Sequence, residues 1–455
     1  MLSGSRTSAA DPVAAFIEAA CVPLDSGHAT GTLERAEAIR AAHPEVASAN
    51  IHTAAILGDD AVVERFLQRD PRNATAKGGP REWDALTHLC FSRYLRLDGA
   101  RSDGFVRVAT ALLDAGASPN TGWFEMNHLP KPEWESVLYG AAGIAHHPEL
   151  TRLLLERGAD PNDGETAYHT PEGYDNRALK ILVESGRITA DNLSVMLIRK
   201  HDWHDYEGVK WLLEHGAGSN HNSPWGFTAI HHALARDNDL AIVELLLDHG
   251  ADPMVVANGM SAAARAARRG RGDVLESLVR RGAPFELRGV ERLIAACARN
   301  DAAAVQSIAA REPELVRELL AEGGKLLAEF AGNGNTDGVR HLLDLGVDVA
   351  ARFREGDGYW GVAADSTALH VAAWRAEHAT VKLLIDRGAP VDVPDAKGRT
   401  PLALAVRACV DSYWTEKRSP ESVDALLRAG ASVSGVKYPS GYAAVDELLA
   451  RAGAS

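Results

Sequence analysis

Apolar and polar positions recur along the chain in a fixed pattern. A pair of leucines, two polar residues and a Gly-Ala step close each copy, as in residues 154–160 (LLERGAD) and 246–252 (LLDHGAD). In the middle of the chain, successive closing glycines lie about 33 residues apart. The pattern predicts repeated pairs of short helices, because one pair has an apolar face that only a neighbouring copy can cover. Further copies lie at residues 112–118, 212–218, 384–390 and 426–432.

The start of each copy is also recognisable. A Thr-X-Leu-His-like sequence lies about 21 residues before the closing glycine at residues 228–231 (TAIH) and 367–370 (TALH). A third copy, at residues 400–403 (TPLA), lies 30 residues before its closing glycine, in a repeat that carries an insertion. A threonine side chain accepts hydrogen bonds from the free amides of a helix start, and Pro401 stands where a missing N–H has no cost. The closing glycine tolerates the left-handed conformation that ends the second helix.

This combination of period, start and closing turn resembles the ankyrin repeat family, over residues 49–430. The resemblance implies an all-α solenoid of about 10–12 helix-turn-helix units with hairpin-loop insertions, and such arrays chiefly bind other proteins. We expect an N-terminal helical cap at residues 1–48, a C-terminal cap at 431–455 and a bacterial source. The resemblance also implies that one set of histidines forms structural hydrogen bonds between adjacent loops. They are His52, His231 and His370.

One repeat departs from the pattern, at residues 163–191. Its segment 164–176 (GETAYHTPEGYDN) contains proline and glycine where the inner helix should be. Both residues disfavour a helix interior, so we expect an irregular unit and a break in regular stacking there.

Four repeats carry roughly ten extra residues each. Counting from the repeat start places two insertions in hairpin fingers before a helix, between residues 116 and 136 and between 346 and 367. The other two, around residues 91–104 and 409–421, fall between the two helices of a repeat. The sequence therefore predicts two elongated fingers and two elongated helix-turn tips.

Tryptophans gather in the fingers and interhelical turns. Fingers and inner helices line the concave groove of an ankyrin-type stack, where large aromatics are favoured anchors for a protein partner. The alternative is that each aromatic pins its own insertion against the stack. The candidate concave and finger surface comprises Trp83, Trp123, Phe124, Trp134, Tyr168, His169, Asp175, Trp203, Trp225, Tyr359, Trp360 and Trp414.

Charge and composition narrow the class of partner. Lys and Arg number 48 against 62 Asp and Glu, which gives a net charge of −14. This balance argues against nucleic acid and favours a basic or neutral protein partner. The sequence shows no membrane-length apolar stretch and no export signal, and its four cysteines lack a metal-binding or disulfide spacing, so we expect a cytoplasmic protein.

Residues 200–206 (KHDWHDY) are the densest cluster of candidate metal or acid–base groups. They fall at an interhelical turn, which favours a structural role. The sequence has no diagnostic catalytic motif, so we predict no catalytic residue, no metal and no cofactor. The alternative is a pocket for a small molecule or sugar, or an unusual enzyme, formed by the fingers and the irregular unit. Its acids would be Asp202, Asp205, Glu125, Glu133 and Asp357.

Overall fold

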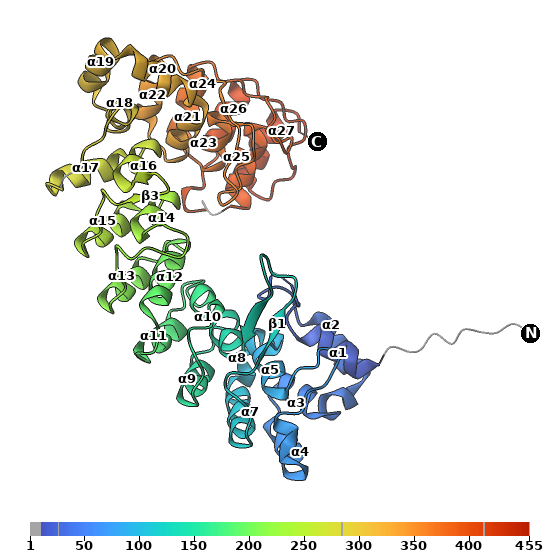
Figure 1. Ribbon diagram of the computed structural model, residues 1–455. Coiled ribbons are helices and arrows are strands. Elements are labelled where there is room, and N and C mark those ends of the chain that lie inside the picture. The colour runs from blue at the N-terminus through green and yellow to red at the C-terminus, as the bar shows by residue number, and fades with distance from the viewer. Residues whose placement is uncertain (1–10, 26, 284, 413–414, 455) are drawn as a thin grey trace, which may run out of the picture. The chain divides into compact units, whose positions relative to one another are not determined.

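The computed structural model describes residues 11–25, 27–283, 285–412 and 415–454. Its contacts divide the chain into two compact units, unit 1 (Met1–Ala229) and unit 2 (Ile230–Ser455). Each unit is built from successive helix pairs, with two-stranded hairpins between some of them (Figure 1). The predicted all-α class is confirmed.

Unit 1 begins with α1 (Pro12–Ala20) and α2 (Glu34–Ala42), which pack on one another. A row of inner segments follows, each packed against the next. The row consists of α3 (Ile51–Leu57), α5 (Ala85–Cys90), α8 (Val137–Tyr139) with the π-helix η4 (Gly140–Ile144), α10 (Glu165–His169) and α12 (Ala190–His201). The outer helices are α4 (Asp60–Arg69), α7 (Ser102–Asp114), α9 (Pro148–Glu156), α11 (Arg177–Glu184) and α13 (Tyr206–Glu214). The connections contain α6 (Arg93–Leu97), η1 (Pro44–Ser48), η2 (Pro71–Ala74) and η3 (Gly99–Arg101).

Unit 2 is built from helices of the same kind, starting with α14, which begins at the boundary between the units in the sequence. Its inner helices are α14 (Ala229–Ala235), α16 (Ala262–Arg268), α18 (Val290–Ala298), α21 (Gly323–Gly332), α23 (Ala368–Trp374) and α25 (Pro401–Val410). Its outer helices are α15 (Leu240–Asp248), α17 (Gly272–Arg280), α19 (Ala302–Arg311), α22 (Thr336–Asp344), α24 (His378–Asp386) and α26 (Glu421–Arg428). The additional elements are α20 (Pro313–Ala321), η5 (Thr415–Lys417) and α27 (Ala443–Arg451). Helix α20 packs on α18 and α19, and α16 contacts both α18 and α21.

The helix boundaries follow from the capping residues that the sequence supplies. Thr400 Oγ1 accepts from the amide of Ala403 at 3.3 Å, and Pro401 takes the first helical position of α25. The closing glycines have positive φ, for example 95° at Gly158 and 81° at Gly250. These positions therefore end the outer helices as predicted.

The loop histidines also act as expected. Their Nε2 atoms lie within hydrogen-bond distance of carbonyl oxygens in the following loop, from His52 to Ala76 at 2.9 Å and from His370 to Arg399 at 3.1 Å. His231 makes the equivalent contact with Met260 at 3.2 Å. The structural role that the resemblance implies for them is confirmed.

The two predicted fingers are antiparallel hairpins. Strand β1 (Gly122–Glu125) pairs with β2 (Glu133–Ser136), with Trp123 opposite Glu135. Strand β5 (Arg352–Phe353) pairs with β6 (Ser366–Thr367), and a bridge between Asp357 and Val362 extends this finger. A third, shorter hairpin joins β3 (Val256–Ala257) to β4 (Met260–Ser261).

In the irregular segment, the inner helix is short. Helix α10 spans only Glu165–His169, and turns occupy residues 170–174 before α11 begins. Asp163 holds its start, because the carboxylate accepts from the amide of Thr166 at 2.8 Å and also contacts the Ser136 hydroxyl. The second bond ties this helix to the end of the β1–β2 finger.

Candidate functional site

Three tryptophans of the predicted binding surface are buried. Trp123 and Trp360 are 7% and 6% exposed, and Trp83 is equally enclosed. The ring centroids of Trp83 and Trp123 lie 5.1 Å apart, and both rings pack on Phe91. The expectation that these three tryptophans present exposed anchors is wrong. Each holds its own finger against the helices, which is the alternative that the sequence left open.

The opposite face of the β1–β2 finger carries the exposed aromatics. Side chains alternate between the two faces of a strand, so Phe124 and Trp134 lie opposite the face that carries Trp123. Their ring centroids are 4.8 Å apart in an edge-to-face contact. Phe124 is 56% exposed, and Met126 and Leu129 at the tip are 69% and 85% exposed. We call Phe124, Met126, Leu129 and Trp134 the fingertip patch.

The remaining candidates of unit 1 lie in α10 and in loops between helices. Tyr168 packs edge-to-face on Trp225, which is 43% exposed, at 5.9 Å. Trp203 packs on the exposed Tyr174 at 6.1 Å. Asp175 forms a surface ion pair with Arg177 at 2.7 Å. Trp414 lies outside the described residues.

In unit 2, the finger residues Tyr359 and Trp360 pack against arginines. The guanidinium carbon of Arg236 lies 3.8 Å from the Tyr359 ring centroid, and that of Arg375 lies 4.8 Å from the Trp360 centroid. Arg375 also binds the buried carboxylate of Asp237 at 2.6 Å. This finger is therefore fastened to the ends of two inner helices.

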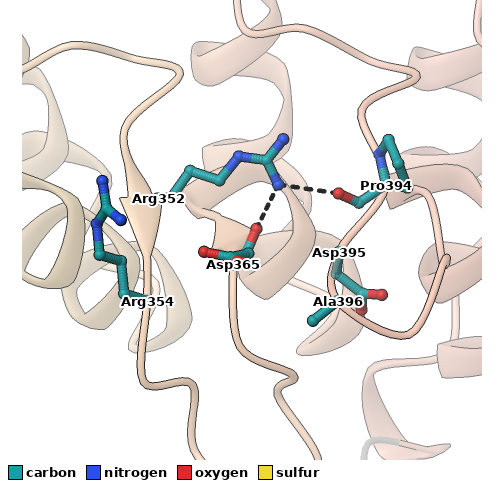
Figure 2. Close-up of a pocket in the computed structure, with 6 residues that line it drawn as sticks. All are labelled: Arg352, Arg354, Asp365, Pro394, Asp395 and Ala396. Atoms are coloured by element: carbon teal, nitrogen blue, oxygen red, sulfur yellow. Dashed lines mark hydrogen bonds between the residues drawn. The ribbon is translucent and has the colours of Figure 1, made fainter.

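A shallow opening of about 380 Å³ lies beside the base of the same finger (Figure 2). Arg352 borders it, but its Nη1 donates to the backbone carbonyls of Asp365 at 2.6 Å and Pro394 at 2.9 Å. Asp395 is held by Arg399 at 2.8 Å. Arg352 connects the finger to the next loop, and Asp395 is already held within that loop. We therefore assign the charged residues around the opening a structural role.

The turn at residues 200–206 is built around a buried lysine. Lys200 Nζ lies 2.9 Å from Asp205 Oδ2 and donates to the carbonyls of Pro171 and Gly173. Asp205 also caps α13 by accepting from the amide of Gly208 at 3.0 Å. Lys200 and Asp205 thus tie this turn to the segment after α10.

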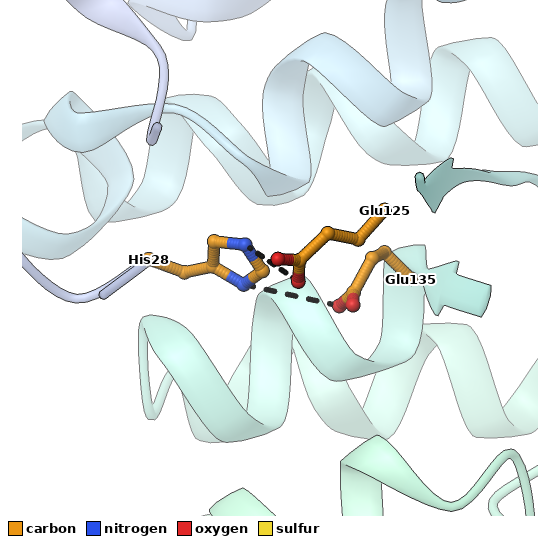
Figure 3. A group of neighbouring side chains, drawn as sticks. All are labelled: His28, Glu125 and Glu135. Carbon is orange, nitrogen blue, oxygen red and sulfur yellow. Dashed lines mark ion pairs between the residues drawn. The ribbon is translucent and has the colours of Figure 1, made fainter. Parts of the chain in front are cut away.

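A cluster that the sequence analysis did not assemble lies beneath the β1–β2 finger. His28, Glu125 and Glu135 meet there, each at least nine-tenths buried (Figure 3). His28 Nε2 lies 3.5 Å from Glu125 Oε2, and its Nδ1 lies 3.9 Å from Glu135 Oε2. Nδ1 is also 3.0 Å from the Tyr139 hydroxyl. Figure 3 shows the imidazole facing both carboxylates.

Burial dominates the electrostatics of this cluster. It lowers the pKa of His28 to about 4, with a smaller contribution from the charge of His169. Burial, with the charges of Glu165 and Glu125, raises the pKa of Glu135 to about 8. Burial also raises the pKa of Glu125. The interior therefore favours a neutral imidazole and at least one neutral carboxyl group.

A second histidine near the cluster, His169 at the end of α10, lies between two carboxylates. Its Nε2 lies 3.1 Å from Glu165, and its Nδ1 lies 2.9 Å from Glu172. Its ring centroid is 5.2 Å from that of Tyr139. Of the sequence-predicted residues, Trp123 therefore packs on His28, and His169 packs on Tyr139, the residue that contacts His28.

Sequence reasoning missed His28 and Glu135 as partners. His28 lies in the cap segment, far along the chain from the finger, and no spacing rule connects them. One signal was available: Glu125 and Glu135 alternate with Phe124 and Trp134, so they share a strand face with Trp123. Two acids on the face that a tryptophan covers indicate a buried polar cluster.

Known proteins match the repeat pattern over part of the chain. Residues 196–289 and 327–435 match the family model for ankyrin repeats (three copies). An 85-residue segment is 41% identical to serine/threonine-protein kinase 12 of Arabidopsis thaliana and covers 19% of this chain and 17% of the kinase. The ankyrin repeat domain of Bcl-3, a member of the IkappaB protein family, is 23% identical with a TM-score of 0.22, and the match covers 51% of this chain and 97% of that domain.

Residues 196–289 and 327–435 form ankyrin repeats, because the helix pairs, their closing turns and the family match coincide there. Ankyrin repeats serve as scaffolds for protein–protein interaction. The chain spans less than a fifth of the length of the plant kinase that it matches. Within the described residues, no helix is long and apolar enough to cross a membrane.

Proposed function

We propose that this protein is a recognition scaffold that binds a protein partner through its concave face and finger loops, with the fingertip patch as the main anchor. The observation that carries the proposal is the exposure of Phe124, Met126 and Leu129 together at the tip of one hairpin. A contiguous exposed apolar group of this kind is typical of an interaction site. The base of the same hairpin is fixed by Trp123, so the patch is presented on a rigid support.

The partner we propose offers an apolar pocket within a basic or neutral surface. The chain carries a net charge of −14, which repels acidic proteins and steers basic ones. Aromatic side chains seated in a pocket supply most of the binding energy in many interfaces. Phe124 and Trp134, held edge-to-face, form such an anchor.

The test combines crosslinking with substitution. A photo-crosslinking residue at Leu129 should capture one basic or neutral protein, and Phe124→Ser should abolish the capture. Val256→Ser is the matched control, because Val256 is 65% exposed on the β3–β4 hairpin of unit 2. Capture that persists in Phe124→Ser, or that Val256→Ser abolishes equally, would contradict the assignment to the fingertip patch.

A second candidate function, the binding of a small molecule or sugar, rests on a cavity of about 350 Å³ in unit 2. Tyr359, Trp360 and Trp374 line it together with the ion pair of Arg407 and Asp411 at 3.6 Å. Aromatic faces beside charged groups suit sugar rings. A thermal shift with one member of a sugar panel that Asp411→Asn removes would favour this function, and the absence of any shift would exclude it for that panel.

A further inference from the structure

Two carboxylates and an imidazole meet inside unit 1 with too few hydrogen-bond partners. His28 Nε2 and Glu135 Oε2 are buried and have no hydrogen bond within the described structure. His28 is 6% exposed and Glu135 is 1% exposed. Buried polar atoms without a partner are costly, and each needs an explanation such as a bound ion.

We propose that His28, Glu125 and Glu135 bind a divalent transition-metal ion of the Zn²⁺ type. One nitrogen of His28 and one oxygen of each carboxylate lie within 4.8 Å of one another. Zn²⁺ binds such atoms at about 2.0–2.2 Å, which places tetrahedral ligand atoms about 3.4 Å apart. His28 Nε2 and Glu125 Oε2 are already 3.5 Å apart, so the main adjustment needed is a closer approach of Glu135.

The charges of the cluster fit a divalent cation. Among the ion pairs of the described residues, neither Glu125 nor Glu135 has a lysine or arginine partner, and both pair only with His28. The nearby cation His169 is held by Glu165 and Glu172 instead. Two ionised carboxylates supply two negative charges, so a divalent ion with a neutral imidazole would make the site neutral.

The surroundings orient the imidazole for this role. In the tautomer in which His28 Nδ1 donates to the Tyr139 hydroxyl, at 3.0 Å, Nε2 keeps its lone pair for a metal. Trp123 lies beside the ring at 5.6 Å, and its buried Nε1–H lacks an acceptor within the described structure. Three protein ligands leave one tetrahedral position for a water molecule, which is an acceptor suited to that indole N–H.

The donor set selects the class of metal. One imidazole nitrogen with two carboxylates suits Zn²⁺ and its transition-metal neighbours, whereas Ca²⁺ and Mg²⁺ prefer oxygen ligands alone. The site would connect the N-terminal segment at His28 with both strands of the β1–β2 finger. Metal binding should therefore stabilise unit 1, because the ligands come together only in the folded chain.

The experiment titrates the full-length, tag-free, chelator-treated protein with ZnCl₂ by calorimetry and repeats the titration with MgCl₂ and CaCl₂. We expect one Zn²⁺ per chain and a rise in melting temperature. Glu135→Gln and His28→Asn should each weaken the affinity by about 100-fold or more. The matched control is Glu133→Gln, the same change on the same strand at a side chain that pairs with His128 at 4.0 Å.

A second measurement keeps the proposal testable if a variant fails to fold. The wild-type protein loaded with Co²⁺ should show visible absorption bands of a four- or five-coordinate site, and ZnCl₂ should displace them. The absence of Zn²⁺ binding would overturn the proposal, as would binding that survives both ligand substitutions or a preference for Mg²⁺ or Ca²⁺. Crosslinking at Leu129 is measured separately, so either idea can fail without the other.

Discussion

Arg375 Nη1 donates to Asp237 Oδ2 at 2.6 Å, although 138 positions separate the two residues. Asp237 follows α14 and Arg375 follows α23, so three inner helices lie between them along the chain. Packed helices lie about 8–10 Å apart, and a straight stack would therefore separate the two ends by roughly 40 Å. Unit 2 is strongly curved at the ends of its inner helices.

The helix contacts depart from a regular succession at the repeat that contains α18 and α19. The additional helix α20 follows this repeat in the sequence. Helix α16 contacts not only α18 but also α21, the inner helix after this repeat. Arg269, at the end of α16, binds both Asp237 at 2.5 Å and Glu329 of α21 at 3.0 Å. Burial alone raises the pKa of Asp237, but Arg269 and Arg375 outweigh it and hold the pKa well below its usual range.

The first prediction concerns this ion pair. Asp237→Ala should lower the free energy of unfolding by about 3–5 kcal/mol, because it leaves buried guanidinium groups uncompensated. A double-mutant cycle with Arg375→Ala, measured by urea denaturation, should give a coupling energy above about 1 kcal/mol. The matched control is the exposed pair Asp344–Arg387 at 2.8 Å, whose coupling should stay below about 1 kcal/mol. Equal coupling in the two pairs would show that burial does not strengthen the Asp237–Arg375 pair.

The second prediction separates buried finger tryptophans from exposed ones. Trp123→Ala and Trp360→Ala should each cost about 3–5 kcal/mol of stability, because each leaves a cavity behind its finger. Trp203→Ala should cost less than about 1 kcal/mol, since that side chain is 37% exposed. Calorimetric melting of the three variants checks this order. Unchanged melting of the first two would restore them as candidate anchors.

The repeated helix pairs were predictable because each signal is local. A capping threonine, a leucine pair and a closing glycine lie within one repeat, and backbone geometry places them without reference to distant residues. The fingers between residues 116 and 136 and between 346 and 367 followed from simple counting. Counting could not reveal the curvature of unit 2, because the curvature is seen in the contact of Asp237 with an arginine four inner helices further along.

The candidate sites were harder to predict for the same reason. An aromatic residue in a finger is either an anchor or a support, and strand alternation decides which: Trp123 faces inward and Phe124 outward. The sequence shows the alternation, but only the pairing of β1 with β2 and their packing show which face is buried. The approach of His28 to Glu135 depends on how the N-terminal segment folds back on the finger, and the local sequence does not encode that path.

The third prediction concerns the packing of α17 against α18. A Cβ atom built on Gly272 would lie 2.0 Å from the carbonyl oxygen of Ala298. Because that neighbour is backbone and cannot rotate away, Gly272→Ala should cost about 1–3 kcal/mol or more. Gly358→Ala is the control, since a Cβ there meets nothing within 4 Å. Equal denaturation midpoints for the two variants would mean that α17 moves away without cost.

The last prediction uses the charge of His169. Burial lowers its pKa, but the hydrogen bonds and charges of Glu165 and Glu172 outweigh burial and raise the pKa to about 9 from an ordinary 6.5. A histidine whose folded-state pKa is raised stabilises the protein fully below the unfolded-state pKa. That contribution is lost as the pH rises from 6.5 through 9.

The stability of the wild type relative to His169→Gln should therefore fall by about 2–3 kcal/mol between pH 6 and pH 9.5. Urea denaturation at a series of pH values measures the difference directly. His43→Gln is the control, because His43 is half-exposed and pairs only with Glu45 at 3.3 Å among the ion pairs of the described chain. Its difference from the wild type should stay within about 0.5 kcal/mol over the same range. A difference for His169→Gln that stays constant or grows with pH would show that His169 is not held as a cation between Glu165 and Glu172.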